Sequence, residues 1–182
     1  MEKIDLTKEK EKKIIDLIKS GAIFIYPTDT IYGLGCNALL PKSIQKIKQI
    51  KSRDKDKPLS IIAPSKEWIL ENTFASKELI DKYLPGPFTL ILKKKDPAFL
   101  SYVSQSETIG IRIPLQDFTN IIQKAGVPFI TTSVNHSGEK FATSVEEIKK
   151  EIIDCVDVVI NIGLLNGNPS TIILPDGSQI KR

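Results

Sequence analysis

The residues best suited to chemistry gather in the segment 26–36, which reads YPTDTIYGLGC. Threonine hydroxyls both donate and accept hydrogen bonds, and glycine lets a backbone come close to a ligand. Such a segment, placed at the end of a strand, suits a site for a small polar molecule. The same residues also suit a turn in which Asp29 or a hydroxyl caps the backbone. The pattern alone leaves both interpretations open.

A second candidate is the group of cations in residues 51–57. Lys51 and Arg53 are two residues apart, so in an extended backbone they would share a face and could bind a phosphate chain. Lys57 follows, immediately before a proline and a leucine. Two aspartates lie between these cations and partly neutralise them. Charge alone therefore favours a solvated loop over a phosphate site.

Arg112 stands inside a regular alternating pattern over residues 108–114. The isoleucines at 109, 111 and 113 face one way, and Arg112 faces the other way with Thr108 and Gly110. An unpaired buried charge is very costly, so this guanidinium must reach a carboxylate, a phosphate or solvent. A structural ion pair and a clamp for a ligand both remain open.

A fourth candidate is the segment 131–138, which reads TTSVNHSG. If a strand continues through it, Ser133 and Asn135 project from the same face at its carboxyl end, where open α/β sheets usually place ligands. An ordinary polar strand end is the alternative. His136 would then point away from that face, so we expect it at the surface or behind the site.

Helical and strand patterns alternate along the whole chain. Helices are expected at about 7–20, from 41 to about 50, 76–84, 118–125 and after the capping-box sequence that begins at Ser144. Strands are expected at 22–26, 59–63, 88–92, 108–114, 127–135, 156–162, 170–174 and 178–182. Some neighbouring strands have no helix between them. We therefore predict one α/β domain over residues 1–182, with a twisted mixed sheet and flanking helices.

Composition narrows the class of protein further. The 182 residues are 41% apolar and 26% charged, which suits a globular core and excludes a disordered tail. The formal net charge of +4 falls short of the concentrated excess of a dedicated nucleic-acid binder. No apolar run is long enough to cross a membrane, and the N-terminus lacks the profile of a secretory signal. We expect a cytoplasmic protein that does not bind membranes.

The metal-binding and nucleophilic residue types are scarce. Cys36 and Cys155 lie far apart without the spacing of a redox pair, so free thiols are expected. His136 is the single histidine, which makes a zinc site or a serine-histidine-aspartate triad an unfavourable interpretation. The sequence therefore predicts no protein-held metal centre.

Several motifs together resemble the YrdC/TsaC/Sua family. They are YPTDTIYGLG, a KxR followed by KPL, LPGPFTLIL, ETIGIRIP, TTSVNHSG and NPSTII, in this order from about residue 22 to the end. Each motif alone would be weak, but the ordered set is specific. The resemblance implies an α/β fold of the YrdC/RibB-like type, in which a twisted sheet and its helices surround a concave, positively charged cavity.

The resemblance also implies an activity. Members of the family are L-threonylcarbamoyladenylate synthases, which convert L-threonine, bicarbonate and ATP, with Mg²⁺, into threonylcarbamoyl-AMP and pyrophosphate. The adenylate then passes to a tRNA-modifying threonylcarbamoyl transferase complex. On this expectation the protein is a nucleotidyltransferase of tRNA processing that resembles the short form of the family.

The motif matches imply roles for individual residues. The expected catalytic set is Lys51, Arg53, Ser133 and Asn135. The expected ATP contacts are Arg53, Lys57, Thr108, Ser133, Asn135, Thr143 and the terminal Arg182, and the expected threonine contacts are Thr30, Arg112 and Ser170.

Other functions remain as alternatives. A non-catalytic module of the same fold that binds tRNA or double-stranded RNA would use the net positive charge, and weak direct tRNA binding is compatible with the enzyme as well. The sequence, however, offers neither an aromatic stacking platform nor a basic stripe. A carbamoyl-transferring homologue, like those of hydrogenase maturation, normally occurs in a much longer chain. The intact KxR and SxN motifs count against a non-catalytic paralogue.

Overall fold

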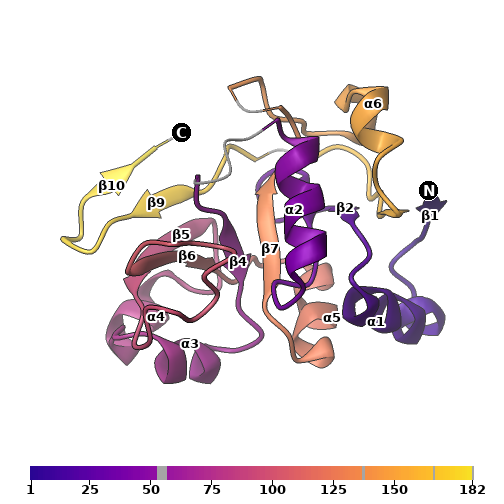
Figure 1. Cartoon of the computed structure of the whole chain (residues 1–182). Coiled ribbons are helices and arrows are strands. Elements are labelled where there is room, and N and C mark those ends of the chain that lie inside the picture. The colour runs from indigo at the N-terminus through magenta and orange to yellow at the C-terminus, as the bar shows by residue number, and fades with distance from the viewer. Residues whose placement is uncertain (53–56, 137, 166, 182) are drawn as a thin grey trace.

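Helices and strands alternate along the chain, as the sequence predicts (Figure 1). The computed structural model describes residues 1–52, 57–136, 138–165 and 167–181. Its strands are β1 (Glu2–Lys3), β2 (Phe24–Tyr26), β3 (Gly33–Gly35), β4 (Ser60–Ile62), β5 (Phe88–Lys93), β6 (Thr108–Arg112), β7 (Phe129–Ser133), β8 (Val158–Val159), β9 (Thr171–Ile173) and β10 (Gln179–Ile180). Its α-helices are α1 (Glu11–Ser20), α2 (Pro41–Ile50), α3 (Lys66–Asn72), α4 (Lys77–Tyr83), α5 (Asp117–Ala125) and α6 (Lys150–Ile153), and the short 3-10 turns are η1 (Lys8–Lys10) and η2 (Val145–Glu147).

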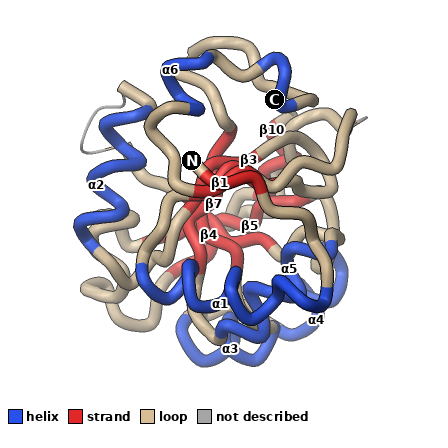
Figure 2. Tube along the Cα trace, turned by 90° about the vertical axis from the view of Figure 1, so that its right-hand side faces the viewer, coloured by secondary structure: helices blue, strands red, loops and turns tan. Residues whose placement is uncertain are grey.

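The strands form one mixed sheet. In the described ranges its order is β1-β8-β2-β3-β7-β4-β6-β5-β9-β10. The pairs β2–β8, β4–β6 and β5–β9 are parallel, whereas β2–β3, β3–β7 and β5–β6 are antiparallel. Figure 2 shows the strands in the middle of the molecule with helices around them. The expected mixed α/β sheet with flanking helices is therefore confirmed.

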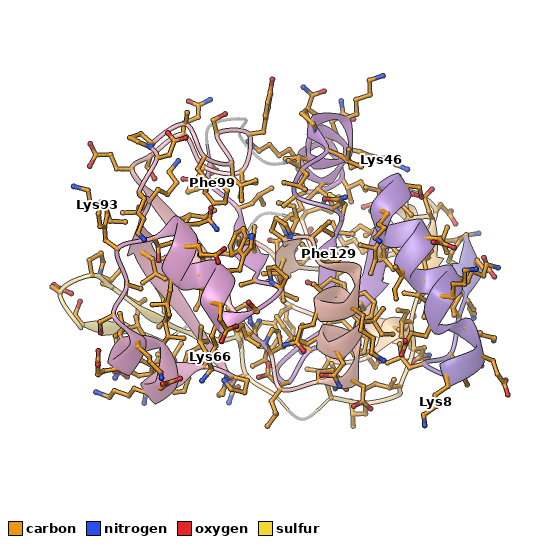
Figure 3. The ribbon with its side chains drawn as sticks, turned by 90° about the horizontal axis from the view of Figure 1, so that it is seen from below. Lys8, Lys46, Lys66, Lys93, Phe99 and Phe129 are labelled. Carbon is orange, nitrogen blue, oxygen red and sulfur yellow. The ribbon has the colours of Figure 1, made fainter. Side chains whose placement is uncertain are left out.

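Alternation along the strands divides the apolar side chains between the two faces of the sheet. Ile61 and Ile130 belong to a cluster that also contains apolar residues of α2, α3 and α4. Their strand neighbours Ile62 and Phe129 belong to a second cluster, which contains apolar residues of α1 and α5. Successive side chains of a strand point to opposite faces, so each cluster covers one face. Figure 3 shows Phe129 in the interior and Lys8, Lys46 and Lys93 at the periphery.

The face under α1 and α5 is apolar along one part and polar along the next. Phe129, Thr131 and Ser133 of β7 share this face. Phe129 packs edge-to-face against Tyr26 with ring centroids 5.4 Å apart, a contact of the kind that contributes about 0.5–1.5 kcal/mol. Thr131 lies opposite Ser60 of β4, and both residues line a cavity. The helices thus bury the apolar part, and the polar part is left for a site.

Two helices end where the sequence predicts. Gly21 after α1 and Gly126 after α5 take the left-handed conformation, with φ of 89° and 69°. Glycine adopts this conformation without a Cβ penalty, so these residues end the helices. Ser76 caps α4 by accepting a hydrogen bond from the backbone N–H of Leu79 at 3.2 Å, as expected. The capping box at Ser144 is present, but it opens the short turn η2, with α6 following separately.

The structure also differs from the expectations in places. Helix α3 is not among the predicted helices; it has seven residues, and Ser65 marks its start by accepting from the backbone N–H of Trp68. The expected strand at 127–135 ends at Ser133, and the strand at 156–162 shortens to Val158–Val159. Cys36 and Cys155 are free thiols, as predicted. None of the helices in the described ranges has the length and apolar character that a membrane span requires.

Candidate active site

A cavity of about 220 Å³ opens over the polar part of the sheet. Its lining comes from segments that are far apart in the sequence, including the 26–33 segment, the β4, β6 and β7 strands and the chain before β9. The polar lining side chains are Thr28, Tyr32, Ser60, Thr89, Arg112, Thr131, Thr132, Ser133, Asn135 and Ser170. Four of the predicted site residues, Arg112, Ser133, Asn135 and Ser170, therefore meet in one place.

Ser133 and Asn135 form a hydrogen-bonded pair at the cavity wall. The Ser133 hydroxyl donates to the Asn135 side-chain oxygen at 2.6 Å, and the Asn135 amide nitrogen donates to the Glu139 carbonyl at 2.6 Å. The sequence places these two side chains on one face on the condition that the strand continues through residue 135, and this condition is not met. The strand ends at Ser133, and a bend follows in which the Asn135 N–H donates to the Ser133 carbonyl at 3.1 Å. The bend, not a continuing strand, brings the two side chains together.

Lys51 holds this pair from behind. Its ammonium donates to the carbonyl of Ser133 at 2.6 Å, to the carbonyl of Asn135 at 2.8 Å and to the Asn135 side-chain oxygen at 3.0 Å. Lys51 is 2% exposed and is not among the lining residues. It ends α2 with φ of −79° and ψ of −2°, so the condition of an extended backbone is not met at Lys51. Its position ties the end of α2 to the end of β7, which lie side by side (Figure 1).

Arg112 forms a buried ion pair with Asp29. The guanidinium donates to one Asp29 carboxylate oxygen at 2.6 Å, and the other oxygen accepts from the backbone N–H of Leu115 at 2.9 Å. Burial lowers the pKa of Arg112, and the neighbouring carboxylate opposes this shift. Arginine nevertheless stays charged at neutral pH. Its Nε is buried, and within the described residues it has no hydrogen-bond partner.

The 26–36 segment contains the capped turn as well as site residues. The Thr28 hydroxyl accepts from the backbone N–H of Thr30 at 3.1 Å and donates to the Ile31 carbonyl at 2.8 Å. The Thr30 hydroxyl is buried 2.8 Å from that of Thr28 and 3.5 Å from Arg112, one layer behind the lining. The capped turn therefore places Thr30 and Asp29 around Arg112.

Gly33 and Gly35 are needed for close packing of the strands, in addition to any approach of a ligand. A Cβ on Gly33 would lie 2.8 Å from the Tyr26 ring, and one on Gly35 would lie 2.0 Å from the Ile130 carbonyl oxygen. Such distances leave no room for a side chain on either residue. Gly33 also lines the cavity. The glycines allow β2, β3 and β7 to pack closely behind the site.

Ser170 lines the cavity from the residue just before β9. It is 4% exposed, and its hydroxyl is 2.8 Å from that of Thr89 in β5. Thr89 is equally buried and lines the cavity. It was missed as a site residue, although it falls inside the LPGPFTLIL motif.

The remaining described candidates lie around the cavity without lining it. Thr108 shares the cavity's face as the first residue of β6, where Ser104 and Ser106 donate to its carbonyl. The Thr143 hydroxyl donates to Glu147 at 3.1 Å, in the capping box. Lys57 is exposed, one residue before the lining residue Pro58. Their roles stay predictions, and Arg53 and Arg182 lie outside the described residues.

The described lining of the cavity is polar and carries little formal charge. Of the described lining residues, Arg112 alone carries a formal charge, and Asp29 pairs with it. The expected positive charge of the cavity stays a prediction. No cluster of three or more histidine, cysteine or acidic side chains in the described ranges could hold a metal ion. His136 lies outside the lining, with its ring Nε2 2.7 Å from a Glu151 carboxylate oxygen.

The model of the Sua5/YciO/YrdC family, described as telomere recombination, matches residues 16–182. The chain belongs to this family. A Methanocaldococcus jannaschii protein, named provisionally as a threonylcarbamoyl-AMP synthase, is 42% identical over 184 residues, which cover 97% of this chain and 87% of that relative. A Vibrio campbellii protein named threonylcarbamoyl-AMP synthase is 28% identical over 180 residues, covering 94% of this chain and 97% of the relative.

A solved structure shares the fold closely. The Pyrococcus abyssi Sua5 protein complexed with L-threonine superposes with a TM-score of 0.84 at 26% identity, over 97% of this chain and 55% of that one. This chain therefore spans about half the length of that Sua5 protein. The similarity confirms the fold that the ordered motifs predict.

Proposed function

We propose that the protein is an L-threonylcarbamoyladenylate synthase, which forms threonylcarbamoyl-AMP and pyrophosphate from L-threonine, bicarbonate and ATP. The observation that carries this proposal is the convergence of Arg112, Ser133, Asn135 and Ser170 on one cavity. The names of the relatives support the same reaction. The RNA-binding alternative receives no comparable support.

Threonine fits the side of the cavity that Arg112 and Ser170 form. The buried Nε of Arg112, without a described partner, suits one oxygen of the threonine carboxylate, since arginine binds carboxylates through several N–H groups. The hydroxyls of Ser170 and Thr89 suit the polar groups of a small amino acid. Thr30, behind Arg112, would act on threonine mainly by fixing that guanidinium.

ATP is assigned to the side formed by Ser133 and Asn135. Lys51 lies behind this wall and fixes Ser133 and Asn135. Its positive charge would stabilise the negative charge that develops on the phosphates during the reaction. Arg53, Lys57, Thr108, Thr143 and Arg182 are proposed as further ATP contacts on the motif matches alone. We expect Mg²⁺ to enter with ATP, held chiefly by phosphate oxygens and water, because the described lining offers hydroxyls and no free acid.

The chemistry depends on alignment more than on proton transfer. The threonine amine attacks the carbon of bicarbonate, and loss of a proton from nitrogen and of hydroxide from carbon, together one water, gives a carbamate. A carbamate oxygen then attacks the α-phosphorus, and pyrophosphate leaves. Alignment of the reactants can supply about 7–11 kcal/mol of the barrier. A wall of hydroxyls, an amide and buried cations suits this task without an imidazole.

The later fate of the product is also part of the proposal. The adenylate would pass to a threonylcarbamoyl transferase complex that modifies tRNA in the cytoplasm. Nothing in the cavity requires direct contact with tRNA. Weak tRNA binding is therefore an accessory property to be measured separately.

Pyrophosphate release tests the proposed reaction. Purified protein with ATP and Mg²⁺ is assayed with both L-threonine and bicarbonate, and with each omitted in turn. We expect release only when both are present. Release that is independent of threonine, or no release together with strongly salt-dependent tRNA binding in filter assays, would replace the synthase by an unspecific hydrolase or by an RNA-binding module.

A further inference from the structure

Tyr32 is a buried cavity residue to which the motif matches assign no role. It directly precedes β3, its side chain is 0% exposed, and it lines the cavity. Its hydroxyl accepts from the backbone N–H of Ile162 at 3.0 Å. The same hydroxyl lies 2.8 Å from the Gly163 carbonyl and 3.1 Å from the Asn161 side-chain oxygen, and its one proton can serve either acceptor.

These partners begin the chain that runs from β8 into β9. We call residues 161–165 and 167–170 the strap. It crosses the upper side of the molecule in the view of Figure 1 and delivers Pro169 and Ser170 to the cavity wall. Along the way, the backbone N–H of Leu165 donates to the Thr143 carbonyl at 2.8 Å.

The strap also contacts the backbone of Thr30, on the proposed threonine side of the site. A Cβ on Gly167 would lie 2.0 Å from the Thr30 carbonyl oxygen and 2.4 Å from its Cα. Only a glycine permits this approach, so the strap rests directly on the backbone of the 26–33 segment. A shift of the strap would therefore move Thr30, and with it the hydroxyl that lies 3.5 Å from the Arg112 guanidinium.

The backbone of Tyr32 holds two further cavity segments. Its N–H donates to the Ala142 carbonyl at 3.1 Å, next to the lining residue Phe141. Its carbonyl accepts from the N–H of Val134 at 3.4 Å, between Ser133 and Asn135. One residue thus joins the strap, the 141–143 segment and the SxN segment.

The Tyr32 hydroxyl is protonated, which allows it to donate a hydrogen bond to the strap. Burial raises the pKa of Tyr32 above its usual range, so the phenol keeps its proton at neutral pH. It remains able to donate to the strap while it accepts from Ile162. A deprotonated or missing hydroxyl would lose at least one of these bonds.

We propose that Tyr32 is a positioning residue whose hydroxyl fixes the strap, and through Gly167 and Ser170 sets the geometry of the amino-acid half of the cavity. The expected change in threonine kinetics rests on the proposed synthase function. The expected fixing of the strap by the hydroxyl does not. The alternative is a tyrosine that merely fills space, in which case the ring matters and the hydroxyl does not.

The variant Tyr32→Phe separates these two roles because it keeps the ring and removes the hydroxyl. Amide hydrogen exchange is measured on peptides from the strap, with Tyr102→Phe, the same change at an exposed tyrosine, as the matched control. We expect exchange at Ile162 and its neighbours to rise by about threefold to tenfold in Tyr32→Phe, as for loss of one net hydrogen bond, with the rest of the sheet unchanged. Unchanged exchange in the strap would overturn the proposal.

Kinetics supply the second readout. In Tyr32→Phe the KM for L-threonine should rise about threefold to tenfold. The KM for ATP should change by less than about twofold. Equal increases in both constants, or a fall in kcat alone, would contradict the assignment to the amino-acid half. If Tyr32→Phe does not fold, Asn161→Ala removes a hydroxyl partner from an exposed position and must give the same pattern in weaker form.

The two readouts keep this inference distinct from the proposed function. Loss of the proposed function would appear as no threonine-dependent turnover in the unmodified protein. The exchange result would still decide whether the Tyr32 hydroxyl fixes the strap. Increased strap exchange without any synthase activity would uphold the structural role and remove only the kinetic one.

Discussion

The ammonium group of Lys51 donates a 2.6 Å hydrogen bond to the backbone carbonyl of Ser133, 82 residues later in the sequence. The same group holds the side-chain oxygen of Asn135. Lysine has three donors, and here they are directed at the end of β7 rather than at solvent. Lys51, the first residue of the KxR motif, is therefore physically coupled to both ends of the SxN motif.

This coupling predicts two effects of Lys51→Met. Turnover should fall tenfold or more, because the Ser133–Asn135 pair loses both its anchor and a nearby positive charge. The free energy of unfolding should also fall by about 1–3 kcal/mol, since half-buried carbonyl oxygens lose their donor. Pyrophosphate release and urea unfolding measure the two effects. Lys42→Met, at an exposed position in the same helix, should change neither; near-normal turnover in Lys51→Met would refute the coupling.

The Arg112–Asp29 pair predicts a large stability effect. Asp29→Asn removes the charge that compensates a buried guanidinium, and breaking such a pair typically costs about 3–5 kcal/mol. Urea unfolding at neutral pH gives the comparison. The control is Asp81→Asn, which breaks an exposed pair with Lys66 and should have little effect. Equal stability of the two variants would mean that Arg112 is compensated by another group.

The contact between Gly167 and Thr30 predicts the result of adding one methyl group. In Gly167→Ala the new Cβ would meet the Thr30 carbonyl, so the strap or the turn must move. The KM for L-threonine should rise about tenfold or more, because small displacements in a site have large kinetic effects. The adjacent exposed variant Asn168→Ala should behave like the unmodified protein. An unchanged threonine KM in Gly167→Ala would show that the strap does not shape the site.

The hydroxyl-rich threonine side predicts selectivity. A site that pairs with a substrate hydroxyl rejects an analogue of the same shape without one, because its buried polar groups lose their partner. Valine should be used at least about a hundredfold less efficiently than threonine, and serine should be intermediate. Pyrophosphate release with each amino acid gives the ratios of kcat/KM. Similar values for valine and threonine would exclude a hydroxyl contact.

Local features of the fold were predictable from the sequence. Gly21 and Gly126 end their helices, Ser76 caps α4, and Arg112 lies opposite the buried isoleucines of β6, because each depends on nearby residues. Apolar periodicity does not predict helix α3, because the helix is short and Ile69 is its one buried residue. A single buried position gives no helical periodicity, and the Ser65 cap was the available signal.

Long-range features of the site were not predictable in the same way. Two partners of Lys51 in the described part of the chain are backbone carbonyls, which carry no sequence signal. Thr89 meets Ser170 because β5 pairs in parallel with β9, a register that patterns along the chain do not specify. The strap depends on Gly167 meeting the backbone of Thr30, 137 positions away, and nothing local marks that contact.

The most direct test of the account follows the carbon of bicarbonate. The protein is incubated with ATP, Mg²⁺, L-threonine and ¹³C-labelled bicarbonate, and the nucleotide products are examined by mass spectrometry. The account predicts an adenylate whose mass includes threonine and the label, formed together with pyrophosphate. AMP and pyrophosphate without a labelled threonine adduct, or an adenylate that lacks the labelled carbon, would contradict it.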